Sequence, residues 1–184
     1  MNKSFDIFFR ELLQAVKTAA ADAFDQNYEN KSFFGDKWKE VKHAVKRGSL
    51  MMRTGALRRG NKAIVTGSSI SFSNSQPHAA LHNEGGSITV TAAMKKFFWA
   101  KYYQAAGRVK QKKRGGITKA SERHNADADY WKSMALMKVG AKLTIPQRRW
   151  IGHHPKVDEL IKQQVDKKVA TLEKDIATSL KQRK

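Results

Sequence analysis

The sequence contains no cysteine and only three prolines in 184 residues. Without cysteine the chain cannot form disulfide bonds, use a thiol as a nucleophile or bind zinc through thiolates. Disulfides are typical of oxidising compartments, so a cytoplasmic origin fits this composition best.

Long apolar runs are also missing. No stretch of about 18 apolar residues occurs, so we expect no membrane-spanning helix and no membrane partner. The opening residues MNKSFDIFFRELL contain acids within an apolar stretch and have no small-residue cleavage site, which does not fit a signal peptide. Hydrophobic residues nevertheless make up 40% of the chain, and its length predicts a single domain over 1–184.

Acidic residues are scarce relative to basic ones. The chain has 36 Lys and Arg against 16 Asp and Glu, a formal net charge of +20, which makes nucleic acid the first partner to test. The tract 94–119 holds no acid and interleaves its basic residues with Phe97, Phe98, Trp99, Tyr102 and Tyr103. Such a tract can bind phosphates and stack bases, or its aromatics can be the buried face of a helix whose lysines face water. Because Phe98, Tyr102 and Ala105 share one helix face, part of the set favours the second interpretation.

Sequence signatures of catalysis are absent as well. There is no Ser/His/Asp order, no GxxxxGK[ST] loop and no Rossmann glycine pattern. The best metal candidate is His78-x-x-x-His82 with Glu84, because two imidazoles four residues apart share one helix face. This short segment stops at Gly85-Gly86, so local capping or a surface position is the preferred interpretation. We predict no enzymatic activity, no metal and no cofactor.

Two long amphipathic helices are predicted near the ends of the chain. Apolar residues recur at helical spacing over 4–26 and from Pro155 to about Lys181. At about 1.5 Å per residue the second helix spans nearly 40 Å, so we expect it to extend past its own core and pack on a neighbouring subunit. Trp38, alone among charges, is expected to insert into the core.

Alternating segments between these helices predict an α+β fold with a small antiparallel sheet. Residues 63–73 predict a β-hairpin that turns at Gly67-Ser68. The short alternating segments 87–91 and 142–145 are expected to pair with each other.

The segment between these two strands predicts a helix at 92–106 and then a mobile basic loop over 107–126. A second helix is expected to begin at Asp127 or Asp129 and to continue through Lys138. We also predict that the loop becomes ordered only on contact with a partner.

The stretch KLTIPQRRWI, residues 142–151, joins this excursion to the C-terminal helix. Pro146 lacks a backbone donor and favours an extended residue before it, so the strand is expected to end there. Trp150 and Ile151 are predicted to pack at the start of the C-terminal helix. Arg148 and Arg149 are predicted to lie at a subunit or partner interface, beside the loop.

Several short motifs, taken in order, resemble the phage virion morphogenesis family, the tail-completion or head–tail joining proteins of Mu-like phages and prophages. They are the tryptophan of GDKWKEVK, LMMRTGALRR at 50–59, HAALHNEGG at 78–86, KKFFWA at 95–100 and IPQRRWIG at 145–152. Family members commonly show "TG-x-L", "YA-x-x-H-x-x-GG"-like and "IP-x-R-x-F-IG" elements in this order. His78 stands where the family usually has Tyr, and Trp150 where it has Phe.

The resemblance covers about residues 35–165 and implies a non-catalytic α+β subunit that completes a phage tail or joins it to the head. It implies tail or head-connector partners, a homo-oligomeric ring, and a location in the host cytoplasm and then the virion. The alternative function is non-specific nucleic-acid binding through 94–119. Expected interface or structural residues are Arg53, Gly55, Leu57, Arg58, His82, Gly85, Gly86, Pro146, Arg148, Arg149 and Trp150. Expected nucleic-acid or partner contacts are Arg108, Lys110, Lys112, Lys113 and Arg114.

Overall fold

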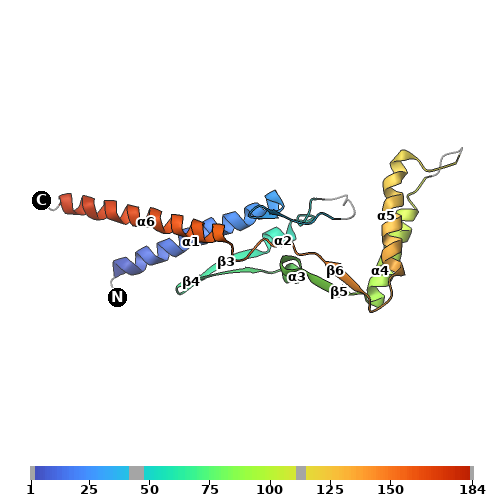
Figure 1. The fold of residues 1–184 in the computed structure, drawn as a ribbon, viewed down its shortest axis with the longest axis horizontal. Coiled ribbons are helices and arrows are strands. Elements are labelled where there is room, and N and C mark those ends of the chain that lie inside the picture. The colour runs from blue at the N-terminus through green and yellow to red at the C-terminus, as the bar shows by residue number, and fades with distance from the viewer. Residues whose placement is uncertain (1–2, 42–47, 111–114, 183–184) are drawn as a thin grey trace. The chain divides into compact units, whose positions relative to one another are not determined.

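The computed structural model describes residues 3–41, 48–110 and 115–182, and has an α+β fold with long helices near both ends (Figure 1). Instead of the single domain expected over 1–184, the chain divides into two compact units. Unit 1 comprises Met1–Glu40, Lys46–Glu84 and Gln147–Lys184. Unit 2 comprises Val41–Val45 and Gly85–Pro146.

Unit 1 contains both long helices and two β-hairpins. Its elements are α1 (Lys3–Asn30), β1 (Ser32–Phe33), β2 (Asp36–Lys37), α2 (Ala56–Arg59), β3 (Asn61–Thr66), β4 (Ser69–Asn74), α3 (Ala79–Glu84) and α6 (Pro155–Gln182). The helices α1 and α6 lie side by side (Figure 1), and Lys168 of α6 forms an ion pair with Glu11 of α1 at 2.9 Å. The predicted hairpin turn at Gly67-Ser68 is confirmed, with Thr66 opposite Ser69.

The apolar stripe of α1 is buried in the middle and the C-terminal part of the helix. Ala20 and Phe24 are buried with Phe33, and the Phe24 ring meets Phe72 of β4 edge-on at 5.0 Å between centroids. The helix continues past the predicted end at residue 26, because Tyr28 is fully buried in a second cluster of the same unit. Burying an aromatic ring stabilises the last turn that carries it.

Unit 2 contains a pair of short strands and a pair of helices between them in the sequence. They are β5 (Gly86–Thr89), α4 (Ala92–Ala106), α5 (Lys119–Leu136) and β6 (Lys142–Ile145). The strands pair antiparallel with Ile88 opposite Leu143, which confirms the predicted pairing. The strand β6 ends at Ile145, before Pro146, as expected. Thr91 caps α4 by accepting the Met94 backbone N–H at 3.2 Å.

The loop predicted over 107–126 was wrong in its extent, because α5 already begins at Lys119. Asp127 and Asp129 therefore lie inside this helix and do not cap it. The residue before it, Thr118, accepts the Ser121 backbone N–H at 2.8 Å, and the buried Ser121 hydroxyl accepts the Lys110 N–H at 2.9 Å. The first turns of α5 have few large apolar residues, so apolar periodicity does not reveal them. They pack through small residues instead, among them the buried Ala128.

Within the described residues, three separate two-stranded sheets stand in place of the one small antiparallel sheet that was predicted. They are the pairs β1–β2, β3–β4 and β5–β6. Each is antiparallel, so the α+β class predicted from the alternating segments is confirmed. Pairs of this length are marginal by themselves, and α1 packs against β1, β3 and β4.

Candidate functional site

Trp150 lies at the centre of unit 1. Its side chain is 1% exposed and packs in one cluster with Tyr28, Trp38, Leu57 and Ala79. The Tyr28 ring centroid lies 5.6 Å from that of Trp150 and 5.9 Å from that of Trp38. The segments 50–59, 78–86 and 145–152 thus meet at one core, although they are far apart in the sequence. Trp38 is a core residue, as predicted.

Asparagine side chains satisfy every hydrogen-bonding group of Trp150. Its backbone N–H donates to Asn83 Oδ1 at 3.0 Å, and its carbonyl accepts from Asn27 Nδ2 at 3.0 Å. Its indole N–H donates to Asn61 Oδ1 at 3.1 Å. Asn83 Oδ1 also accepts the Ile151 N–H at 3.2 Å. Buried polar groups must be paired, so these amides fix the position of the tryptophan in the core.

Arg148 and Arg149 are held within unit 1. Arg148 is 7% exposed; its Nε donates to the Lys39 carbonyl at 2.9 Å and its backbone N–H to the His82 carbonyl at 2.8 Å. Burial lowers the pKa of Arg148 below the ordinary value for arginine, and the charge of Arg53 adds to this. The Arg149 carbonyl accepts the Trp38 indole N–H at 2.6 Å, and its guanidinium lies 4.9 Å from the Phe33 ring centre. The expected interface role was therefore wrong for Arg148, which the fold buries.

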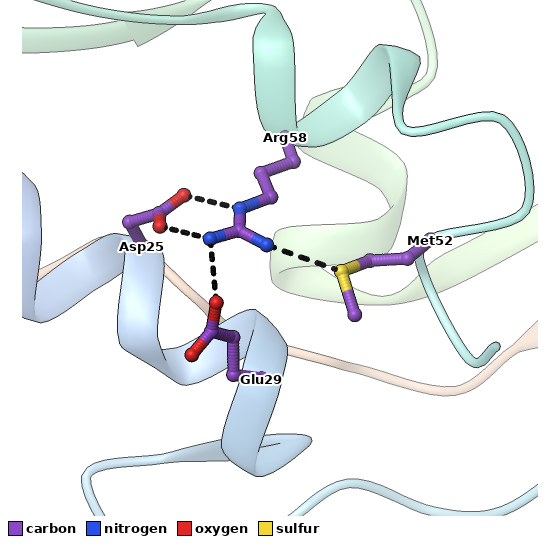
Figure 2. A network of polar contacts seen from close by, with 4 residues as sticks. All are labelled: Asp25, Glu29, Met52 and Arg58. Carbon is purple, nitrogen blue, oxygen red and sulfur yellow. Dashed lines mark hydrogen bonds and ion pairs between the residues drawn. The ribbon is translucent and has the colours of Figure 1, made fainter.

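Arg58 joins α2 to α1 through an ion-pair network (Figure 2). Its Nε donates to Asp25 Oδ1 at 2.6 Å, and its Nη2 donates to the other Asp25 oxygen and, at 2.8 Å, to Glu29. Its Nη1 points at the Met52 sulfur, 3.8 Å away (Figure 2). The hydrogen bonds that Arg58 donates to Asp25 and, to a lesser extent, to Glu29 raise the pKa of Arg58 above its ordinary value. Two carboxylates already neutralise this guanidinium, so it is a poor ligand for a phosphate.

His82 is half-buried next to His78, with 5.7 Å between the ring centroids. Burial lowers the pKa of His82 below its ordinary value, and the charges of His78, Arg148 and Arg53 lower it further. A neutral imidazole can bind a metal, but a site needs more than two ligands. Within residues 3–41, 48–110 and 115–182 no group of three or more His, Cys, Asp or Glu is arranged to hold a metal ion.

The remaining predicted site residues lie in unit 1 or at the ends of the segment Gly85–Pro146 of unit 2. Gly55 has φ 71° directly before α2, a left-handed conformation that favours glycine, and Leu57 is buried in the Trp150 cluster. Arg53 is exposed. Gly85 also has a positive φ, 77°, where the chain leaves unit 1, and Pro146 is the last residue of the second segment of unit 2. These residues shape the backbone at the unit boundaries.

The basic residues predicted as nucleic-acid or partner contacts follow α4 in unit 2. Arg108 and Lys110 are exposed, and the Lys110 carbonyl accepts the Thr118 N–H at 3.1 Å. Lys112, Lys113 and Arg114 lie outside the described residues. The structure therefore places two of the five predicted contacts, both on the solvent side of unit 2.

Sequence reasoning missed the asparagines that hold Trp150. The sequence did contain a signal for one of them, because Asn27 follows Phe24 by three residues and so continues the apolar stripe of α1. Asn27 is 3% exposed. A polar residue in an apolar stripe must find a buried partner, and here that partner is the Trp150 carbonyl. Asn61 and Asn83 gave no comparable signal.

Two surfaces of the described structure are apolar and exposed. In unit 1, the stripes of α1 and α6 become exposed toward the helix ends beyond the Glu11–Lys168 ion pair. We call this the apolar tip surface, and it consists of Phe5, Phe9, Val169, Leu172, Ile176 and Leu180. In unit 2, α4 exposes Phe97 and Tyr103 beside basic residues. Monomers rarely leave such stripes uncovered, so these surfaces are the candidate contact sites.

None of the helices in the described part of the chain combines the length and the apolar character that crossing a membrane requires. Comparison of the chain with protein-family models, with curated proteins and with solved structures gives no match. The two exposed surfaces and the core around Trp150 are therefore the features of the structure that bear on function.

Proposed function

We propose that this protein is a structural subunit of a phage particle, which acts in tail completion or head–tail joining and assembles into a homo-oligomeric ring. It would assemble in the bacterial cytoplasm and remain in the virion, in contact with tail or head-connector proteins. The apolar tip surface would be the contact between copies. The observation that carries the proposal is the change of exposure along α1 and α6.

In α1, Val16, Ala20 and Phe24 are buried, whereas Phe9 and Phe5 of the same stripe are 36% and 60% exposed. In α6 the exposed fraction rises from 41% at Val169 to 63% at Leu180. If the two helices packed only in the core of their own chain, their apolar stripes would end where that core ends. The continued stripe provides a partner with apolar area, and covering a leucine or isoleucine contributes about 1.5–3 kcal/mol.

The charge of the two helices favours a second copy as that partner. Although the whole chain carries +20, α1 has three basic and five acidic residues, and α6 has six basic and five acidic. The helix pair is thus close to neutral, with a net charge of −1. Like charges repel, so copies of a strongly basic chain associate most readily through their least charged part. A heterologous contact of this kind can close into a ring.

The resemblance to the phage family supports the particular role. The motifs at 50–59, 78–86 and 145–152 contribute Leu57, Ala79 and Trp150 to one buried cluster. Residues that set a common fold are expected to share a core, so the pattern is consistent with a shared architecture.

The test compares matched double variants by size-exclusion chromatography with light scattering, with and without purified phage tail tubes. We expect the wild type to form oligomers and to cosediment with the tubes. Leu172→Glu/Ile176→Glu should be monomeric, because the two added carboxylates at each contact would have to leave water. Leu136→Glu/Val139→Glu changes the charge equally at exposed positions of unit 2 and should still assemble.

Circular dichroism confirms that both double variants remain folded. Assembly of Leu172→Glu/Ile176→Glu as in the wild type would overturn the proposed contact. A wild type that stays monomeric and does not bind tail tubes would refute the assembly role itself.

A further inference from the structure

Helix α4 has an exposed aromatic face that the packing of unit 2 does not use. Its buried side is formed by Phe98 and Ala105, which face α5, and the Phe98 ring lies 6.0 Å from that of Trp131. On another side of the helix Tyr103 is 66% exposed, whereas Phe97 is 51% exposed and also meets the Trp131 ring of α5 edge-on at 5.9 Å between centroids. Helix α4 thus carries aromatic rings on sides that its buried residues do not face.

The exposed aromatic rings are arranged as a platform. Trp99 and Tyr103 are one helical turn apart and stack with 5.9 Å between centroids and 27° between planes. On the other border of the exposed face, Lys101 Nζ lies 5.5 Å from the Phe97 ring centre. The stack on half-buried Trp99 limits the freedom that the exposed Tyr103 ring has to lose on binding.

The charge around this platform is positive throughout. From Gly85 to Ser121 the sequence has no acid, and over 85–146 thirteen Lys and Arg face three Asp and Glu. Lys96 is exposed on the same face as Tyr103, and Arg108 and Lys110 are exposed after the end of α4. An anionic ligand would therefore meet basic side chains along the direction of the helix.

We infer that the exposed face of α4 binds single-stranded nucleic acid, with Lys96, Arg108 and Lys110 at the phosphates and unpaired bases stacked on Tyr103 and Trp99. Single-stranded ligands combine a phosphate chain with free base faces, which matches a basic surface with aromatic rings. An acidic protein segment would satisfy the lysines but has no flat faces for the rings. The inference concerns unit 2 and stands apart from the proposed assembly contact in unit 1.

The experiment measures the fluorescence anisotropy of a labelled oligothymidine and of a duplex of equal length, titrated with the full chain. We expect the single strand to bind more tightly than the duplex, and log affinity to fall as log salt concentration rises. Tyr103→Ala should weaken single-strand binding about five- to a hundredfold, which corresponds to the removal of one base stack. Leu136→Ala, at a 62% exposed position of α5, is the matched control and should bind as the wild type does.

A second pair of variants tests the phosphate contacts. Lys96→Gln/Arg108→Gln should reduce the salt slope by about 0.7 for each phosphate that the variant no longer neutralises. The charge control Lys62→Gln on β3 should leave the slope unchanged. No binding at low salt, a salt slope near zero, or single-strand binding by Tyr103→Ala equal to the wild type would each overturn the inference. The first two results would assign the face to a protein contact.

Discussion

Asn83 shows how a single amide determines the path of the chain into α6. Its Oδ1 accepts the backbone N–H groups of both Trp150 and Ile151. Trp150 then fills the core of unit 1, and Ile151 packs, as do Val157 and Leu160 at the start of α6, against the neighbouring cluster of Ala20, Phe24 and Phe33. The expectation that both residues pack at the start of α6 is thus confirmed for Ile151, whereas Trp150 lies in the central cluster.

Asn83→Ala should lower the free energy of unfolding by about 1–3 kcal/mol, because two partly buried backbone donors lose their acceptor. Urea denaturation followed by tryptophan fluorescence measures the change. The control is Asn125→Ala on α5, whose exposed amide donates to Asp129 at 3.3 Å. It should change stability by less than about 0.5 kcal/mol. Equal losses for the two variants would show that Asn83 has no special role.

At the scale of elements, α2 is a helix of four residues that cannot be stable alone. Leu57 anchors it in the core, and Arg58 joins it to Asp25 and Glu29 of α1 (Figure 2). The neighbouring Arg59 is exposed and donates only to the Thr54 carbonyl within its own turn, at 3.0 Å. Arg58 therefore connects two elements, whereas the adjacent Arg59 makes only a local contact.

Arg58→Ala should destabilise the protein by about 0.5–1.5 kcal/mol, a range discounted for solvent screening because the Arg58 side chain is 32% exposed. Arg59→Ala is the matched control and should change stability by less than about 0.5 kcal/mol. Thermal unfolding at low and high salt compares them, and the loss for Arg58→Ala should shrink at high salt. A loss that does not depend on salt would indicate that Arg58 acts through packing.

At the scale of the whole molecule, the charge is distributed unevenly along the chain. The long helices of unit 1 are close to neutral, whereas the segment 85–146 has thirteen basic and three acidic residues. A nearly neutral apolar surface suits association between copies, and a basic surface suits an anionic partner. The two proposed contacts should therefore respond to salt in opposite directions.

Raising NaCl from about 0.05 to about 0.5 M should strengthen self-association, because screening weakens repulsion between chains of net charge +20. The same change should weaken oligonucleotide binding, because counterion release then contributes less. Sedimentation velocity and fluorescence anisotropy on one preparation measure both effects. If self-association also weakened with salt, charge pairing and not apolar contact would hold the copies together.

The sequence by itself predicted the elements whose residues repeat at a regular spacing. Apolar periodicity predicted α1 and α6, alternation predicted the β3–β4 hairpin and the β5–β6 pair, and Pro146 marked the end of β6. These features depend on interactions between near neighbours, so a local pattern is enough to reveal them. The first turns of α5 were not predicted, because they pack through small residues and have no apolar stripe.

Only the tertiary structure decided which residues meet across long sequence distances. Arg148 and Arg149 look alike in the sequence, yet one is buried against Lys39 and the other lies against the Phe33 ring. The sequence likewise supplied the +20 charge but not the exposure of Tyr103 next to the burial of Phe98. Burial depends on contacts with distant segments, and no local pattern encodes those contacts.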